Sequence, residues 1–153
     1  MSKTDYIIPK IEVKVDMLID GETSPGIEEY ILFLDEFSRY RRGKETMYEF
    51  LNKRKEKEFI PLKSCNTGEL FLMKLDDIIF VKEKDRSGQQ SLQEIVFTLR
   101  NNIQLEVGHI NPLPESQSRV LDYLNQEVRF IVFYHDERKI FINKNKIIKV
   151  KER

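Results

Sequence analysis

Hydrophobic and polar residues alternate along two separate stretches of the chain. The first, "VKVDMLI" (13–19), has Val, Val, Met and Ile at every second position and then meets Asp20-Gly21. The second, "IVFTLRNNIQLEV" (95–107), alternates up to Leu99, passes Asn101-Asn102 and resumes its alternation at Ile103. Strict alternation is typical of a half-buried strand, and Asp-Gly or Asn pairs favour tight turns. Each stretch therefore predicts a strand, a turn and a second strand.

A helical pattern follows each of these strand pairs. Apolar residues stand at positions i, i+3 and i+4 in "TMYEFLN" (46–52) and in "RVLDYLN" (119–125). This spacing gives each segment one apolar stripe. Helices this short are not stable alone in water, so we expect both to dock on the sheet.

The segments downstream of the two helices also correspond to each other. Phe-Ile-Pro-Leu (59–62) matches Phe-Ile-Val-Phe (130–133), a polar turn follows in each, and "LFLM" (70–73) matches "KIFI" (139–142). The final strands "DIIFVKEK" (77–84) and "KIIKVKER" (146–153) correspond as well. The chain therefore reads as two copies of one unit, each with a strand pair, a short helix, a hairpin and a last strand.

An asparagine ends both helical phrases, at Asn52 and Asn125. Asn tolerates the left-handed backbone conformation that terminates a helix, so the pattern favours a terminating role at both positions. The alternative is that the amide side chain has a function of its own.

We therefore predict a mainly β (α+β) fold made of two tandem small β-barrel-like repeats, each with one short inserted helix. The expected boundaries are an N-terminal tail (1–9), a first repeat (10–84), a linker (85–91) rich in polar residues and glycine, and a second repeat (92–153).

The quoted motifs resemble a known pattern. "EFLN…FIPL…LFLMKLDDIIFV" and "DYLN…FIVF…IFINKNKIIKV" resemble small bacterial proteins of uncharacterised function. The order of elements is also similar to five-stranded barrels of the SH3-like or Sm-like type. The resemblance covers nearly all of both halves and implies the fold. It implies no catalytic residue, and such barrels bind RNA, peptides or small ligands alike.

Composition bounds the class of protein. The 153 residues are 40% apolar and include ten Phe and six Tyr, which is enough for a packed core. The single cysteine, Cys65, fits a reducing compartment. The N-terminal "MSKTDYIIPK" has no signal-peptide core, and no apolar run approaches the roughly 18 residues of a membrane helix. We expect a soluble cytoplasmic protein without membrane insertion.

Catalytic and metal chemistry find little support in the sequence. The candidate ligands His109, His135 and Cys65 lie in different segments, so we expect no metal site and no cofactor. Cys65 lies in a stretch typical of a hairpin turn, and Asp76-Asp77 reads as a solvated turn. We therefore expect no enzymatic activity.

Charge is segregated although 26 basic residues balance 26 acidic ones. Residues 16–37 contain seven acidic residues and no basic one. Residues 39–58 contain eight basic and four acidic residues, and residues 138–153 contain seven basic residues and one acidic residue. An edge strand protected by lysines, a nucleic-acid interface and a protein interface are each consistent with this pattern.

Two candidate surfaces follow from these patterns. The segment "YILFLDEF" (30–37) has more apolar residues than one strand face needs, which predicts contact with a protein partner or a second copy through Tyr30, Leu32, Phe33 and Phe37. The favoured function is thus a non-catalytic adaptor or scaffold. The alternative is an RNA- or DNA-binding module that uses the basic segments 39–57 and 138–153, through Arg39, Tyr40, Arg41, Arg42, Lys53, Arg54, Lys149 and Lys151.

Overall fold

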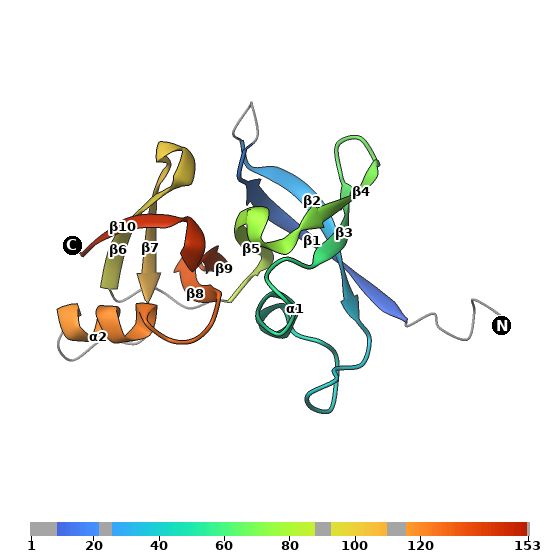
Figure 1. Ribbon diagram of the computed structural model, residues 1–153, viewed down its shortest axis with the longest axis horizontal. Helices are drawn as coiled ribbons and strands as arrows, with labels where there is room; N and C mark the ends of the chain where they lie inside the picture. The colour runs from blue at the N-terminus through green and yellow to red at the C-terminus, as the bar shows by residue number, and fades with distance from the viewer. Residues whose placement is uncertain (1–8, 22–25, 88–92, 110–115, 153) are drawn as a thin grey trace.

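The protein folds around one ten-stranded antiparallel sheet with two short helices (Figure 1). The computed structural model describes residues 9–21, 26–87, 93–109 and 116–152. The mainly β class is therefore confirmed. None of the helices in these ranges is long and apolar enough to cross a membrane.

The elements follow the predicted order. The strands are β1 (Lys10–Ile19), β2 (Glu28–Asp35), β3 (Phe59–Ser64), β4 (Leu70–Lys74), β5 (Ile78–Arg86), β6 (Gln93–Leu99), β7 (Gln104–His109), β8 (Phe130–His135), β9 (Arg138–Asn143) and β10 (Ile147–Glu152). The helices are α1 (Met47–Asn52) and α2 (Ser116–Leu124), and short 3-10 turns are η2 (Leu75–Asp77), η3 (Arg100–Asn102) and η4 (Lys144–Lys146).

The strands pair in the order β10-β6-β7-β8-β9-β5-β1-β2-β3-β4. This is an open sheet whose end strands are β4 and β10, and the described strands close no barrel. Its two halves nevertheless share one order, because β5-β1-β2-β3-β4 is repeated as β10-β6-β7-β8-β9. Each half also has a helix between its second and third strands and a 3-10 turn between its fourth and fifth.

The two hairpins have the same register. In the first half Phe59 pairs with Lys74 and Pro61 with Leu72. In the second half the corresponding pairs are Phe130 with Asn143 and Val132 with Phe141. The correspondence read from the sequence therefore holds residue by residue across the hairpins.

Two hydrophobic cores exchange side chains across the middle of the sheet. The first-half core contains Phe130 and Phe141 from the second half. The second-half core contains Leu18, Ile79 and Phe80 from the first half. Burying one such phenylalanine stabilises a fold by about 1.5–3 kcal/mol, so the exchange joins the halves strongly.

Strand β5 lies between the two cores and pairs with β1 on one side and β9 on the other. Its residues from Ile78 to Val81 are all fully buried, because both faces of the strand are covered. The strand continues to Arg86, two residues into the stretch expected to be a linker. Residues 88–92 of that stretch lie outside the described ranges.

Both asparagines lie at helix ends, but neither has the predicted left-handed conformation. The non-glycine residues with left-handed φ among those described are Asn102, Asp136 and Glu137, all in turns between strands. Asn52 instead reaches the second half: its Nδ2 donates to the carbonyl oxygen of Phe130 at 3.0 Å, and its Oδ1 accepts from the Phe130 amide at 2.7 Å. The Asn52 amide therefore has a structural role, since it joins the end of α1 to the second half.

Candidate binding surface

A groove beside α1 brings together residues from both predicted surfaces. It has a volume of about 340 Å³ and lies among the start of β1, the end of β2, the loop before α1 and the start of β3. Its lining includes Phe33 from the predicted protein contact and Arg39, Tyr40, Lys53 and Arg54 from the predicted nucleic-acid contact. Strands and a helix distant in sequence therefore converge at one place.

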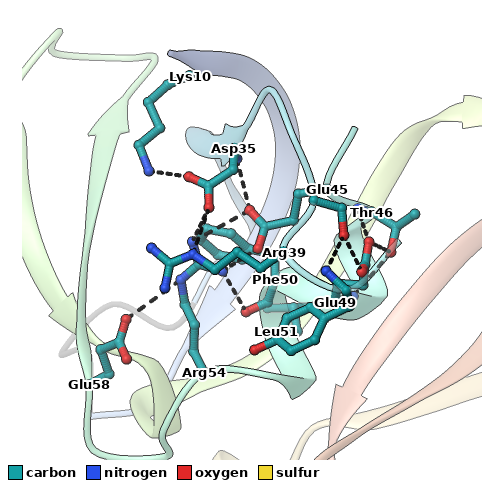
Figure 2. A network of polar contacts seen from close by, with 12 residues as sticks. Lys10, Asp35, Arg39, Glu45, Thr46, Glu49, Phe50, Leu51, Arg54 and Glu58 are labelled. Atoms are coloured by element: carbon teal, nitrogen blue, oxygen red, sulfur yellow. Dashed lines mark hydrogen bonds and ion pairs between the residues drawn. The ribbon is translucent and has the colours of Figure 1, made fainter. Parts of the chain in front are cut away.

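The floor of the groove is a network of opposite charges (Figure 2). The buried carboxylates of Asp35 and Glu45 lie around the guanidinium of Arg54, whose Nη1 is 2.6 Å from Glu45 Oε2. The same guanidinium lies 4.2 Å from the centre of the Phe50 ring, and Lys10 pairs with Asp35. Arg54 therefore has a structural role and offers little free charge to a ligand.

A second arginine fixes the loop that precedes α1. Arg41 donates to the carbonyl oxygens of Arg42, at 2.7 Å, and of Lys44, and its Nε lies 3.2 Å from Glu49 Oε1. Gly43 in this loop has a φ of +101°, a conformation that residues with a side chain rarely adopt. The loop is thus built around the Arg41 side chain.

Glu49 ties this loop to the helix. Its backbone amide donates to the Thr46 side chain, and its carboxylate accepts from the Thr46 amide at 2.9 Å, which forms a capping box. Burial alone would raise the pKa of Glu49, but hydrogen bonds from Ser38 and Thr46, with the charge of Arg41, outweigh it and hold the pKa below its ordinary value. Glu49 is therefore a buried anion at neutral pH.

Fewer basic residues remain available than the sequence suggests. Arg39, Arg42 and Lys53 are exposed. The Nε atom of Arg39 lies 3.9 Å from Oδ2 of Asp35, which is a long distance for an ion pair. The Tyr40 side chain is 58% exposed and has the Lys53 ammonium 5.8 Å from its ring centre. The Tyr40 ring and the cations of Arg39 and Lys53 thus form an accessible wall of the groove, whereas Arg42 is exposed outside its lining.

The basic residues of the second half lie elsewhere. Lys149 and Lys151 are exposed on β10, which pairs with β6 and forms one end of the sheet of described strands. This placement matches the edge-strand interpretation, in which lysines discourage unwanted strand pairing. The structure does not bring these two residues to the groove, whose lining comes entirely from the first half.

Of the four residues predicted for protein contact, two are buried in the core and two are partly or largely exposed. Tyr30 and Leu32 belong to the first-half core, so their burial removes both side chains from any contact surface. Phe33 is half-buried on the opposite face of β2, and Phe37 is 67% exposed beyond the end of the strand. The sequence of β2 is apolar on both faces, so it does not say which face lies inside.

An exposed apolar surface that sequence reasoning missed lies next to the groove. We call it the β3–β4 face; it consists of Phe59, Pro61, Leu70 and Leu72. Phe59, Leu70 and Leu72 have exposed fractions of 57%, 61% and 67%. Pro61 and Leu72 are directly paired, and Phe59 and Pro61 also line the groove. The available signal was that "LFLM" is apolar at positions facing both sides of an edge strand.

The candidate catalytic groups are held in local contacts. Lys82 is buried, and its ammonium lies 2.7 Å from His135 Nδ1 and 3.5 Å from Asp136. Burial and the charge of Lys82 lower the pKa of His135. Burial and the nearby Glu29 raise the pKa of the Cys65 thiol, which disfavours the reactive thiolate.

Metal ligands do not gather in the part of the chain that the structure describes, where no cluster of three or more His, Cys, Asp or Glu side chains suits an ion. Asp76 instead accepts from the side chains of Asn143 and Asn145 at 3.1 and 3.0 Å. It therefore helps to join the two halves rather than forming an acid–base pair with Asp77.

Comparison with known proteins adds no family to this description. No protein-family model, curated protein or solved structure matches the chain.

Proposed function

We propose that this protein is a non-catalytic adaptor or scaffold that binds a protein partner, or a second copy of itself, through the β3–β4 face. The observation that carries the proposal is the grouping of exposed Phe59, Leu70 and Leu72 on the hairpin that ends the sheet. Contiguous exposed apolar patches mark interaction sites, and an unpaired edge strand accepts a further strand. Unlike β10, strand β4 has no lysine before its last residue.

The architecture suits such a role. We propose that the halves are tandem small β-barrel-like repeats, as the shared strand order and hairpin register support. The exchange of core side chains makes the pair one rigid platform. The structural use of His135 and the raised pKa of Cys65 favour binding over catalysis, and we assign the protein to the cytoplasm on its single cysteine.

A capture experiment with a matched control tests the proposed surface. The tagged chain is used to capture proteins from nuclease-treated native lysate, and the stoichiometry of the eluted complex is measured. We expect Leu72→Glu to lose the partner, because a charge would be buried in an apolar contact. Ile27→Glu changes a side chain of similar exposure outside the face and is expected to retain it. Equal recovery with wild type and Leu72→Glu would contradict the proposal.

Nucleic-acid binding is a second candidate, favoured by the exposed Tyr40 ring beside Lys53 on the groove wall. An aromatic ring that stacks on a base, together with cations that contact phosphates, is typical of single-strand binding. This candidate predicts that affinity for single-stranded oligonucleotides falls steeply with salt and that Arg39→Glu with Lys53→Glu, both at exposed positions of the groove lining, abolishes it. Binding that is insensitive to salt and to both substitutions would exclude the groove as the nucleic-acid site.

A further inference from the structure

The exposed β3–β4 face corresponds to a surface that is already buried in the second half. Its residues Phe59, Pro61 and Leu72 are the counterparts of Phe130, Val132 and Phe141 in the β8–β9 hairpin. Phe130 and Phe141 lie inside the first-half core, and Val132 packs against it. The second half therefore docks on the first half through the same hairpin face that the first half leaves exposed.

The asparagine that contacts Phe130 also has a counterpart in the second half. Asn52, at the end of α1, binds both backbone groups of Phe130. Its counterpart Asn125 follows the end of α2 and is exposed, and its side chain has no hydrogen-bond partner among the described residues. The counterpart of Phe130 is Phe59. A second copy of the chain could thus place its Asn125 against Phe59 as Asn52 lies against Phe130.

The sheet edges complete the correspondence. Strand β5 of the first half pairs with β9 of the second, with Val81 opposite Phe141. The counterparts of β5 and β9 are β10 and β4, which are the two end strands of the sheet in the described part of the chain. Repeating the internal pairing between molecules sets β10 of one copy beside β4 of the next, with Val150 opposite Leu72.

We propose that copies of this protein associate head to tail, with α2 and β10 of one molecule covering the β3–β4 face of the next. This inference rests on the proposed function and names its partner as a second copy. The contact repeats the interface between the halves, so it joins two different surfaces of the molecule. Such a heterologous contact generates closed rings or open filaments.

Two differences make the contact between copies weaker than the contact within the molecule. Phe80 and Leu18, which enter the second-half core, have Lys149 and Thr98 as their counterparts. Ile148, the counterpart of the fully buried Ile79, keeps its apolar character and is 58% exposed. The interface is therefore less apolar, and the association is reversible and depends on concentration.

Complementation between two variants tests the proposal. Leu72→Glu disables the β3–β4 face, and Ile148→Glu disables the β10 surface; both side chains are exposed, so both variants should fold. In sedimentation equilibrium, wild type should gain mass as its concentration rises, and each variant alone should remain monomeric. An equimolar mixture should form a dimer and stop there, because each pair keeps one intact face and one intact edge. Asn125→Ala should weaken wild-type association about tenfold through its lost hydrogen bonds.

Three results would overturn the proposal: wild type that remains monomeric at all concentrations, a mixture that does not associate, or a single variant that still self-associates. The first of these leaves the proposed function open to its own test. If Leu72→Glu then loses a captured protein that differs from this chain, the β3–β4 face binds another partner and only the head-to-tail inference fails. If Leu72→Glu captures the same proteins as wild type, the proposed function fails too.

Discussion

Arg54 shows how a basic residue in a charged segment serves the fold instead of a ligand. Its neighbours in the sequence suggest a basic surface, but its guanidinium is held by Glu45 and lies over Phe50. The acids that neutralise it come from β2 and from the loop before α1. The sequence shows the charges of each segment, whereas their pairing depends on how those segments meet in space.

Replacing Arg54 should therefore destabilise the protein. Arg54→Met leaves Glu45 buried without its cation and removes one of the cations around Asp35, and removing one partner of a buried pair typically costs about 3–5 kcal/mol. Arg42→Met, at an exposed position of the same basic segment, is the control and should change stability by less than about 0.5 kcal/mol. Urea unfolding measures both. Similar stability for the two variants would show that the network does not hold the groove floor.

The repeated asparagines show what local reasoning misses. The helix-terminating role is predicted from local sequence, because it depends only on the last turn of the helix. The contact between Asn52 and Phe130 joins residues 78 positions apart, and no periodicity within either segment indicates it. The internal repeat was the indication in the sequence, because it places an asparagine at the end of the helix in both halves.

At the scale of elements, the sequence predicts most of the strands and both helices. Alternation located β1, β6 and β7, and the i, i+3, i+4 spacing located α1 and α2. Alternation could not tell that Tyr30 and Leu32 face the core or that Leu72 faces outward. The orientation of a strand face depends on its register with neighbours, and that depends on turns and core packing together.

The β8–β9 hairpin turn makes a pH-dependent contact with β5. His135 lies 2.7 Å from the buried Lys82, and burial and that charge lower its pKa below the ordinary value of about 6.5. Below that pH the unfolded chain binds a proton more readily than the folded one, so stability falls as the pH decreases. Urea unfolding from neutral to mildly acidic pH should show this loss. His135→Gln should make the profile flatter, and an identical slope in the variant would contradict the assignment.

At the scale of the whole molecule, the two halves are alike in topology but not in their surroundings. The hairpin face of the second half is covered by the first half, whereas the hairpin face of the first half is open. Lys149 occupies the position where Phe80 closes the internal interface. A lysine in place of a core phenylalanine makes the proposed interface between copies weaker than the interface between the halves.

Restoring the apolar residue should strengthen association. Lys149→Phe adds a side chain whose burial is worth about 1.5–3 kcal/mol, which corresponds to a more than tenfold tighter contact. Sedimentation equilibrium measures the change. The double variant Lys149→Phe with Leu72→Glu should return to a monomer. Association that persists in the double variant would indicate non-specific contact of the new phenylalanine.

The central claim is that the free edges of the sheet meet between copies, and amide hydrogen exchange tests it most directly. Exchange is measured at low and at high protein concentration, with local resolution along the sheet. If the two edges meet, amides of β4 (Leu70–Lys74) and β10 (Ile147–Glu152) should become protected at high concentration, while those of β5 and β9 should not change. Exchange that is independent of concentration at both edges, or protection confined to other strands, would show that the edges of β4 and β10 do not meet between copies.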